Sequence, residues 1–161
     1  MKSKGFTLIE LVVVIIILGI LAVAVAPKFL NISRDARIAS LDGFVGAVKS
    51  ANSIVMSKAV LAGVASAKVE TNIPNTDLYV LDGNMSIKPE HIEAAMNVDG
   101  FMITDYSLNE RIPSAFVYLG DKKLEYPELR AMRCSVLLSR SVVGGDIVTR
   151  ELQVEKIYDG C

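Results

Sequence analysis

Apolar side chains are concentrated in one run near the N-terminus. Between Phe6 and Ala26 the only polar side chains are Thr7 and Glu10, and from Leu11 onward the run has none. A helix of these 21 residues is about 30 Å long, which is the thickness of the hydrocarbon core of a bilayer. The pattern therefore predicts a membrane-spanning helix.

A second pattern, with apolar residues three and four positions apart, follows Pro27 and predicts an amphipathic helix. Its members are Leu41, Phe44, Val45, Val48, Ala51, Val55, Ala59 and Ala62, with Asn52 on the same stripe. Gly63 is suited to end the helix, and Pro27 predicts a kink because it removes one backbone donor. We expect one helix of about 57 residues, roughly 85 Å long, whose first half projects from a domain and whose second half packs on it.

The rest of the chain reads as short strands. We expect strands at Leu78–Leu81, Phe101–Tyr106 and Ala115–Leu119, followed by a hairpin turning at Gly144–Gly145–Asp146. The two hairpin runs each place one set of apolar residues on one face: Met132, Cys134, Val136 and Leu138, then Val148, Leu152 and Val154. Val64–Thr76 reads as a surface loop, and Ser86 with Pro89 starts a short helix ending near Met96. A long helix on an antiparallel sheet, an α+β architecture, is the predicted fold.

The charged residues indicate which end of the chain stays in the cytoplasm, and they exclude one class of function. The formal net charge of -1, from 17 basic and 18 acidic side chains, excludes a polybasic nucleic-acid binder of the usual kind. Lys2 and Lys4 precede the apolar run, which favours a cytoplasmic N-terminus and an exported domain. On an exported domain the pair Cys134 and Cys161 reads as one disulfide, and a turn at Asp159–Gly160 could bring the tail back to form it.

Glu10 is the unusual residue of the apolar run. A cleaved signal peptide ending among Ala22, Ala24 and Ala26 is an alternative interpretation of the run. Neither that interpretation nor an ordinary span accounts for the carboxylate, which costs about 2.5–3.5 kcal/mol inside a spanning helix. A position near the wet interface, or compensation by the helix N-terminus, would explain why Glu10 is tolerated but not why it is present.

The segment KGFTLIEL, with its basic leader, Gly5, Phe6 and Glu10, resembles the type IV prepilin signature. The resemblance implies that residues 1–5 are a leader peptide, which a membrane peptidase removes after Gly5 before methylating the new amino terminus at Phe6. Residues 6–27 would then be the transmembrane and polymerisation helix. Residues 28–161 would be a globular pilin domain with a C-terminal disulfide region.

The same resemblance assigns a role to Glu10 and names the partners. Glu10 would neutralise the amino group of Phe6 on a neighbouring subunit and so set the register of a helical homopolymer. Gly19 and Pro27 fall where the family carries helix-weakening residues. The subunit would wait in the inner membrane, with its domain in the periplasm, until the assembly machinery adds it to an extracellular pilus. Loss of Lys2 and Lys4 would change the side-chain charge from -1 to -3.

Three further segments resemble pilins of the mannose-sensitive haemagglutinin type, which implies a use in surface attachment: Ala26–Asn31, Asp35–Arg37 and Lys58–Val64. Two alternatives stay open. A type II secretion pseudopilin shares the N-terminal signature, although its major kind usually has a calcium loop and no disulfide. A minor pilin that captures DNA would need a basic tip, and the basic residues Lys122, Lys123, Arg130 and Arg133 are interleaved with Glu125 and Glu128.

Other candidate chemistry is weak. His91 is expected to lie on the surface of a short helix, and no nucleophile-elbow sequence accompanies it. Asp82–Gly83–Asn84 lacks the alternating acids of a calcium loop and reads as a turn. Asn31 and Asn84 begin three-residue glycosylation patterns, which arise often by chance. We expect no enzyme activity, no cofactor, no metal and no nucleic-acid partner.

Overall fold

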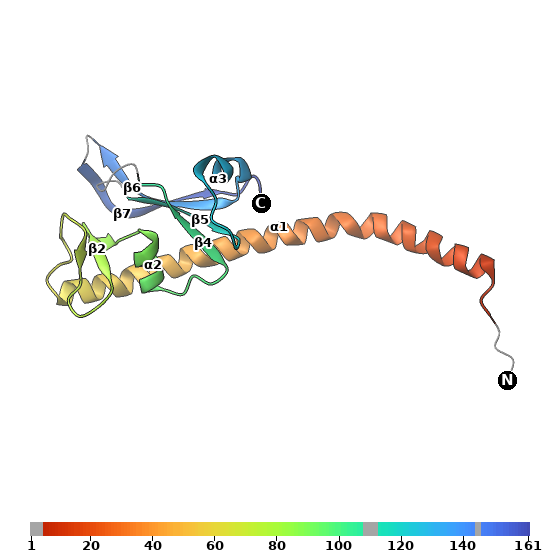
Figure 1. The fold of residues 1–161 in the computed structure, drawn as a ribbon, viewed down its shortest axis with the longest axis horizontal. Helices are drawn as coiled ribbons and strands as arrows, with labels where there is room; N and C mark the ends of the chain where they lie inside the picture. The colour runs from red at the N-terminus through yellow and green to blue at the C-terminus, as the bar shows by residue number, and fades with distance from the viewer. Residues whose placement is uncertain (1–4, 108–112, 144–145) are drawn as a thin grey trace. The chain divides into compact units, whose positions relative to one another are not determined.

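One helix of 54 residues, α1 (Leu8–Leu61), confirms the long helix expected from the sequence. The structure, a computed structural model, describes residues 5–107, 113–143 and 146–161 (Figure 1). The chain divides into two units, Met1–Ala36 and Arg37–Cys161, and α1 begins in the first and ends in the second. Residues 1–4 of the expected leader 1–5, and residues 144–145 of the expected hairpin turn, lie outside the described residues.

The C-terminal end of α1 is set by Gly63, as expected. Gly63 has a φ of 73°, a left-handed conformation that costs little only for glycine. Its N–H donates to the carbonyl of Val60 at 3.1 Å, and the Val64 N–H donates to the carbonyl of Ala59 at 3.0 Å. These two bonds form a Schellman motif, which satisfies carbonyls that the helix itself leaves without donors.

The apolar stripe on the second half of α1 is the core of the second unit. Its buried members are Leu41, Phe44, Val45, Val48, Ala51, Val55 and Ala59. Ala62 is exposed, so its assignment to the stripe was wrong, because the helix has already ended at Leu61. Asn52 is half-buried, and its side chain bonds Asn84 at 2.9 Å and the Met85 N–H at 2.8 Å.

Two antiparallel sheets accompany α1 and confirm the α+β architecture. The small sheet has the order β1 (Thr71–Asn72), β2 (Tyr79–Leu81) and β3 (Asn84–Met85). The larger has the order β4 (Phe101–Asp105), β5 (Ser114–Leu119), β6 (Ser135–Val143) and β7 (Asp146–Ile157). Strand β1 lies inside the segment expected to be only loop, and that expectation was wrong.

Two short helices, α2 and α3, complete the fold of the described residues (Figure 1). Helix α2 (Pro89–Ala95) begins after Lys88, so Ser86 is not its first residue. Helix α3 (Tyr126–Met132) was not expected, and it contains Met132, which had been assigned to a strand face. The signal for α3 was present in the sequence, because Glu125 and Glu128 form a capping box at its start.

The larger sheet buries both of its faces. One face packs with the α1 stripe through Ile103, Ala115, Val117, Val136 and Leu138. The other face forms a second cluster, in which Phe116 and Tyr118 pack with Leu129 of α3. Because successive residues of a strand point to opposite faces, neighbouring residues of β5 enter different clusters.

Candidate assembly segment and C-terminal disulfide region

The first part of α1 is apolar and has no packing partner within the described chain. The window Leu8–Val25 has a mean hydropathy of 3.2 over 18 residues, none of them buried. Phe6, just before the helix, is 90% exposed. By length and composition this segment is able to cross a membrane.

Glu10 lies at the N-terminus of its own helix. Its Oε2 accepts hydrogen bonds from the Thr7 N–H at 2.8 Å and the Thr7 hydroxyl at 2.7 Å, and Thr7 Oγ1 accepts from the Glu10 N–H at 3.3 Å. Thr7 and Glu10 therefore form a capping box, and its T-x-x-E spacing is the signal in the sequence that predicts it. The helix N-terminus also favours a negative charge at this position.

Gly5, Gly19 and Pro27 are the other residues assigned to the assembly segment. A β-carbon added at Gly5 or Gly19 would meet nothing within 4 Å. Helix α1 continues through Gly19 and Pro27, and the kink at these residues stays a prediction. The pairing of Glu10 with the amino group of another subunit's Phe6 also stays a prediction.

The predicted disulfide between Cys134 and Cys161 is present. Their Cα atoms are 4.7 Å apart and 27 positions apart in sequence. Cys134 is buried in the main core, and Cys161 packs against that core. The bond closes a loop that contains the whole β6–β7 hairpin.

The turn that returns the tail to Cys134 is set by Gly160, as expected. The Gly160 N–H donates to the carbonyl of Arg133 at 2.8 Å. A β-carbon at Gly160 would collide with the carbonyl oxygen of Met132, so only glycine fits without a backbone shift. The side chains of Arg133 and Asp159 form an exposed ion pair across the same turn.

A second set of polar contacts joins the end of β7 to α1, and the sequence did not predict it. The Tyr158 hydroxyl donates to Asp42 Oδ1 at 2.7 Å, and Lys156 Nζ lies 2.6 Å from the same oxygen. Burial and the bond to Asp42 raise the pKa of Tyr158. The bonds from Lys156 and Tyr158 lower the pKa of Asp42. The C-terminal tail is thus held to α1 by the bonds of Tyr158 and Lys156 to Asp42, and to Cys134 by the disulfide of Cys161.

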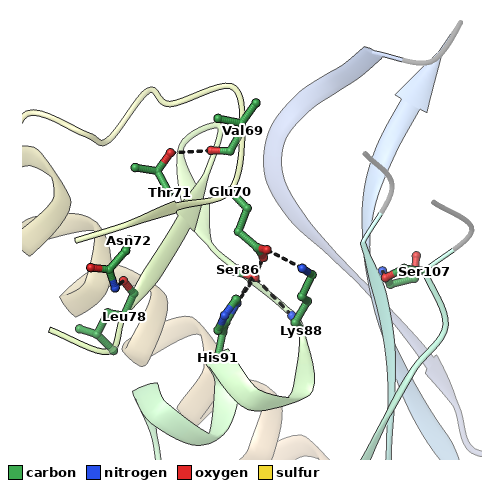
Figure 2. Close-up of polar contacts among 10 residues, drawn as sticks. Val69, Glu70, Thr71, Asn72, Leu78, Ser86, Lys88, His91 and Ser107 are labelled. Carbon is green, nitrogen blue, oxygen red and sulfur yellow. Dashed lines mark hydrogen bonds and ion pairs between the residues drawn. The ribbon is translucent and has the colours of Figure 1, made fainter. Parts of the chain in front are cut away.

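His91 belongs to a polar cluster shown in Figure 2. Its side chain is only 12% exposed and stacks on Tyr79 at 4.0 Å, so its expected surface position was wrong. His91 Nδ1 lies 2.8 Å from Ser86 Oγ and 3.2 Å from Glu70 Oε1, while Lys88 pairs with the other oxygen of Glu70. A serine–histidine–acid relay needs both ring nitrogens, one for each partner. Here one nitrogen faces both partners, so the arrangement links α2 to Glu70, just before β1, and to Ser86, just after β3, and does not activate the serine.

The segment Asp82–Gly83–Asn84, considered above for calcium binding and glycosylation, also has a structural role. Asp82 and Gly83 have positive φ values, 42° and 83°, and form the tight turn between β2 and β3. Asp82 accepts a bond from Lys68 at 2.7 Å, and its carbonyl accepts one from the buried Arg140 at 2.8 Å. Asn84 is buried against Asn52, which excludes it as an exposed glycosylation acceptor. Within the described residues no three metal-binding side chains cluster.

Comparison with known proteins finds one matching family model and several curated relatives. Residues 1–26 match the family model described as the prokaryotic N-terminal methylation motif. A relative from Thermus thermophilus, described as "Type IV narrow pilus major component PilA5", is 44% identical over 59 residues, 37% of this chain and 51% of the relative. A "Fimbrial protein" of Pseudomonas aeruginosa is 30% identical over 100 residues, 61% of this chain and 63% of the relative.

The chain thus spans about half to under two thirds of the length of the curated relatives it matches. No solved structure matches the chain significantly.

Proposed function

We propose that this chain is a structural subunit of a type IV pilus filament. The observation that carries the proposal is the apolar segment Leu8–Val25, which has no buried residue, together with the single carboxylate of Glu10 at its start. A segment of this kind, with its apolar side chains unburied, is available to pack against lipid or other subunits. The methylation motif over residues 1–26 and the names of the two relatives support the same conclusion.

Processing would divide the chain at Gly5. Residues 1–5 would be the leader, residues 6–27 the polymerisation helix, and residues 28–161 the globular domain. A prepilin peptidase would cut before Phe6 and methylate its amino group. The mature subunit would wait in the inner membrane with its domain on the periplasmic side, and then enter an extracellular filament.

Assembly would exchange one partner of Glu10 for another. In the single chain its carboxylate is held by Thr7. In the filament it would face the amino group of Phe6 on a neighbouring subunit. Transfer from lipid to a protein core brings little net hydrophobic gain, so a charge pair can select one register among many apolar ones. Bending at Gly19 and Pro27 would adapt the helix to its neighbours.

The role would be structural and not enzymatic. Because three segments resemble pilins of the mannose-sensitive haemagglutinin type, the finer proposal is a filament that serves surface attachment. Self-association would be the main interaction, and neither a cofactor nor nucleic acid is required for it.

Three experiments test the proposal. The intact mass of the mature protein should correspond to a chain that begins at methylated Phe6, whereas a start after Ala26 would make the run a signal peptide. Electron microscopy of sheared surface filaments, with mass spectrometry, should find this chain in them.

Glu10→Val as the sole subunit should be processed and inserted but absent from filaments. The control Glu90→Val, which removes an exposed carboxylate of the domain, should assemble. Normal filaments of Glu10→Val would show that register is set elsewhere.

A further inference from the structure

The face of the larger sheet that carries α3 has a hollow of about 670 Å³ beside that helix. Its floor is formed by Phe116, Leu137 and Ile157, one residue from each of β5, β6 and β7. Tyr106, just after β4, and Tyr126, the first residue of α3, also line it. Both tyrosines are half-exposed, so small solutes reach them from solvent.

The rings of Tyr106 and Tyr126 are stacked almost in parallel. Their centroids are 4.3 Å apart and their planes differ by 10°. At this separation the carbon atoms of the two phenol rings lie in contact across the stack. Phe116 packs obliquely against both rings, at 5.3 Å and 6.1 Å, and holds the pair in place.

From this geometry we propose that Tyr106 and Tyr126 are an oxidative cross-linking site, at which a peroxide-dependent one-electron oxidant joins the two rings as dityrosine. Each phenol gives up one electron and one proton, and the two phenoxyl radicals form a carbon–carbon bond at the positions next to the hydroxyls. Two ring hydrogens then move to oxygen as the rings become aromatic again. Hydrogen peroxide takes up the two electrons and two protons and leaves as two water molecules.

The surroundings favour this pair over the other described tyrosines. Interaction with the neighbouring Tyr106 and with the charge of Arg130 lowers the pKa of Tyr126, and a phenol that ionises more readily is more easily oxidised. Tyr118 is fully buried, Tyr79 stacks on His91, and the hydroxyl of Tyr158 is bound to Asp42. Neither the ring beside Tyr79 nor the acceptor of Tyr158 is a second phenol. The product would link the end of β4 to the start of α3 covalently.

The test uses the full chain purified in detergent and treated with a haem peroxidase and hydrogen peroxide. Dityrosine fluorescence should appear in the monomer, with a yield per chain that does not change on dilution. Tryptic mapping should find peptides 69–111 and 124–130 joined, two hydrogen atoms lighter than their sum, with fragment ions placing the link at Tyr106 and Tyr126. The linked monomer should also melt at a higher temperature than the untreated chain.

Conservative variants separate the site from general oxidation. Tyr126→Phe and Tyr106→Phe keep a stacked ring but lack one phenol, and each should reduce the monomer cross-link to background. Tyr79→Phe is the matched control and should cross-link like the unaltered chain. Cross-links that persist in Tyr126→Phe would overturn the proposal, and so would dityrosine found only between chains or only at Tyr79 or Tyr158.

Discussion

Removal of the disulfide is the perturbation whose magnitude the structure defines best. The double variant Cys134→Ala with Cys161→Ala removes the bond without leaving a free thiol. The bond joins residues 27 positions apart, and a loop of that length restrains the unfolded chain by about 3–4 kcal/mol in the chain-entropy model. Domains of this size are stable by only about 5–15 kcal/mol, so the variant should fold but be far less stable.

Urea unfolding of the full chain in detergent, followed by the fluorescence of its tyrosines, measures this loss. With a slope of about 1–3 kcal/mol per molar urea, the midpoint should fall by about 1–4 M. The unaltered protein measured in reductant should show the same shift. The control Gln153→Ala, exposed on β7 within the same loop, should stay within about 0.5 kcal/mol.

A loss below about 1 kcal/mol in the double variant would refute the reasoning. It would mean that the bonds of Asp42 to Tyr158 and Lys156 hold the tail without the disulfide, or that the unfolded chain is already restricted.

Three further predictions use the same assay. Gly160→Ala should cost about 1–3 kcal/mol, because its β-carbon collides with the Met132 carbonyl and the backbone must shift; unchanged stability would contradict this. Asn52→Ala should cost about 1–3 kcal/mol by leaving the buried Met85 N–H without its acceptor, whereas Ser53→Ala on the exposed side should be nearly neutral. Burial raises the pKa of Glu70, but bonds from Lys88 and Ser86 and the charges of His91 and Lys88 outweigh it and lower the pKa. Its stabilisation should be complete above the unfolded pKa of about 4.3 and be lost as pH falls through the lower folded pKa, and Glu70→Gln should remove that dependence.

Local sequence patterns predicted an element correctly where a single requirement defines it, such as the helical repeat of apolar residues or a positive φ. The apolar stripe of α1 repeats at the helical period, and Gly63 ends the helix because only glycine adopts its φ without cost. The missed helix α3 carried a local signal too. Glu125 and Glu128 were interpreted as part of a mixed charged surface, although their spacing is that of a capping box.

The sequence by itself determined the apolar segment, the long helix and its end, most of the strands of the larger sheet, and the pair of cysteines available for a disulfide. Only the tertiary structure decided which polar groups meet. Asp42 and Tyr158 are 116 residues apart, and Arg140 reaches the Asp82 carbonyl across 58 residues. The burial of His91 beside Glu70 is of the same kind. Apolar burial follows from a periodic pattern along the chain, whereas a buried polar group needs a specific partner, and that partner is defined only when distant segments pack together.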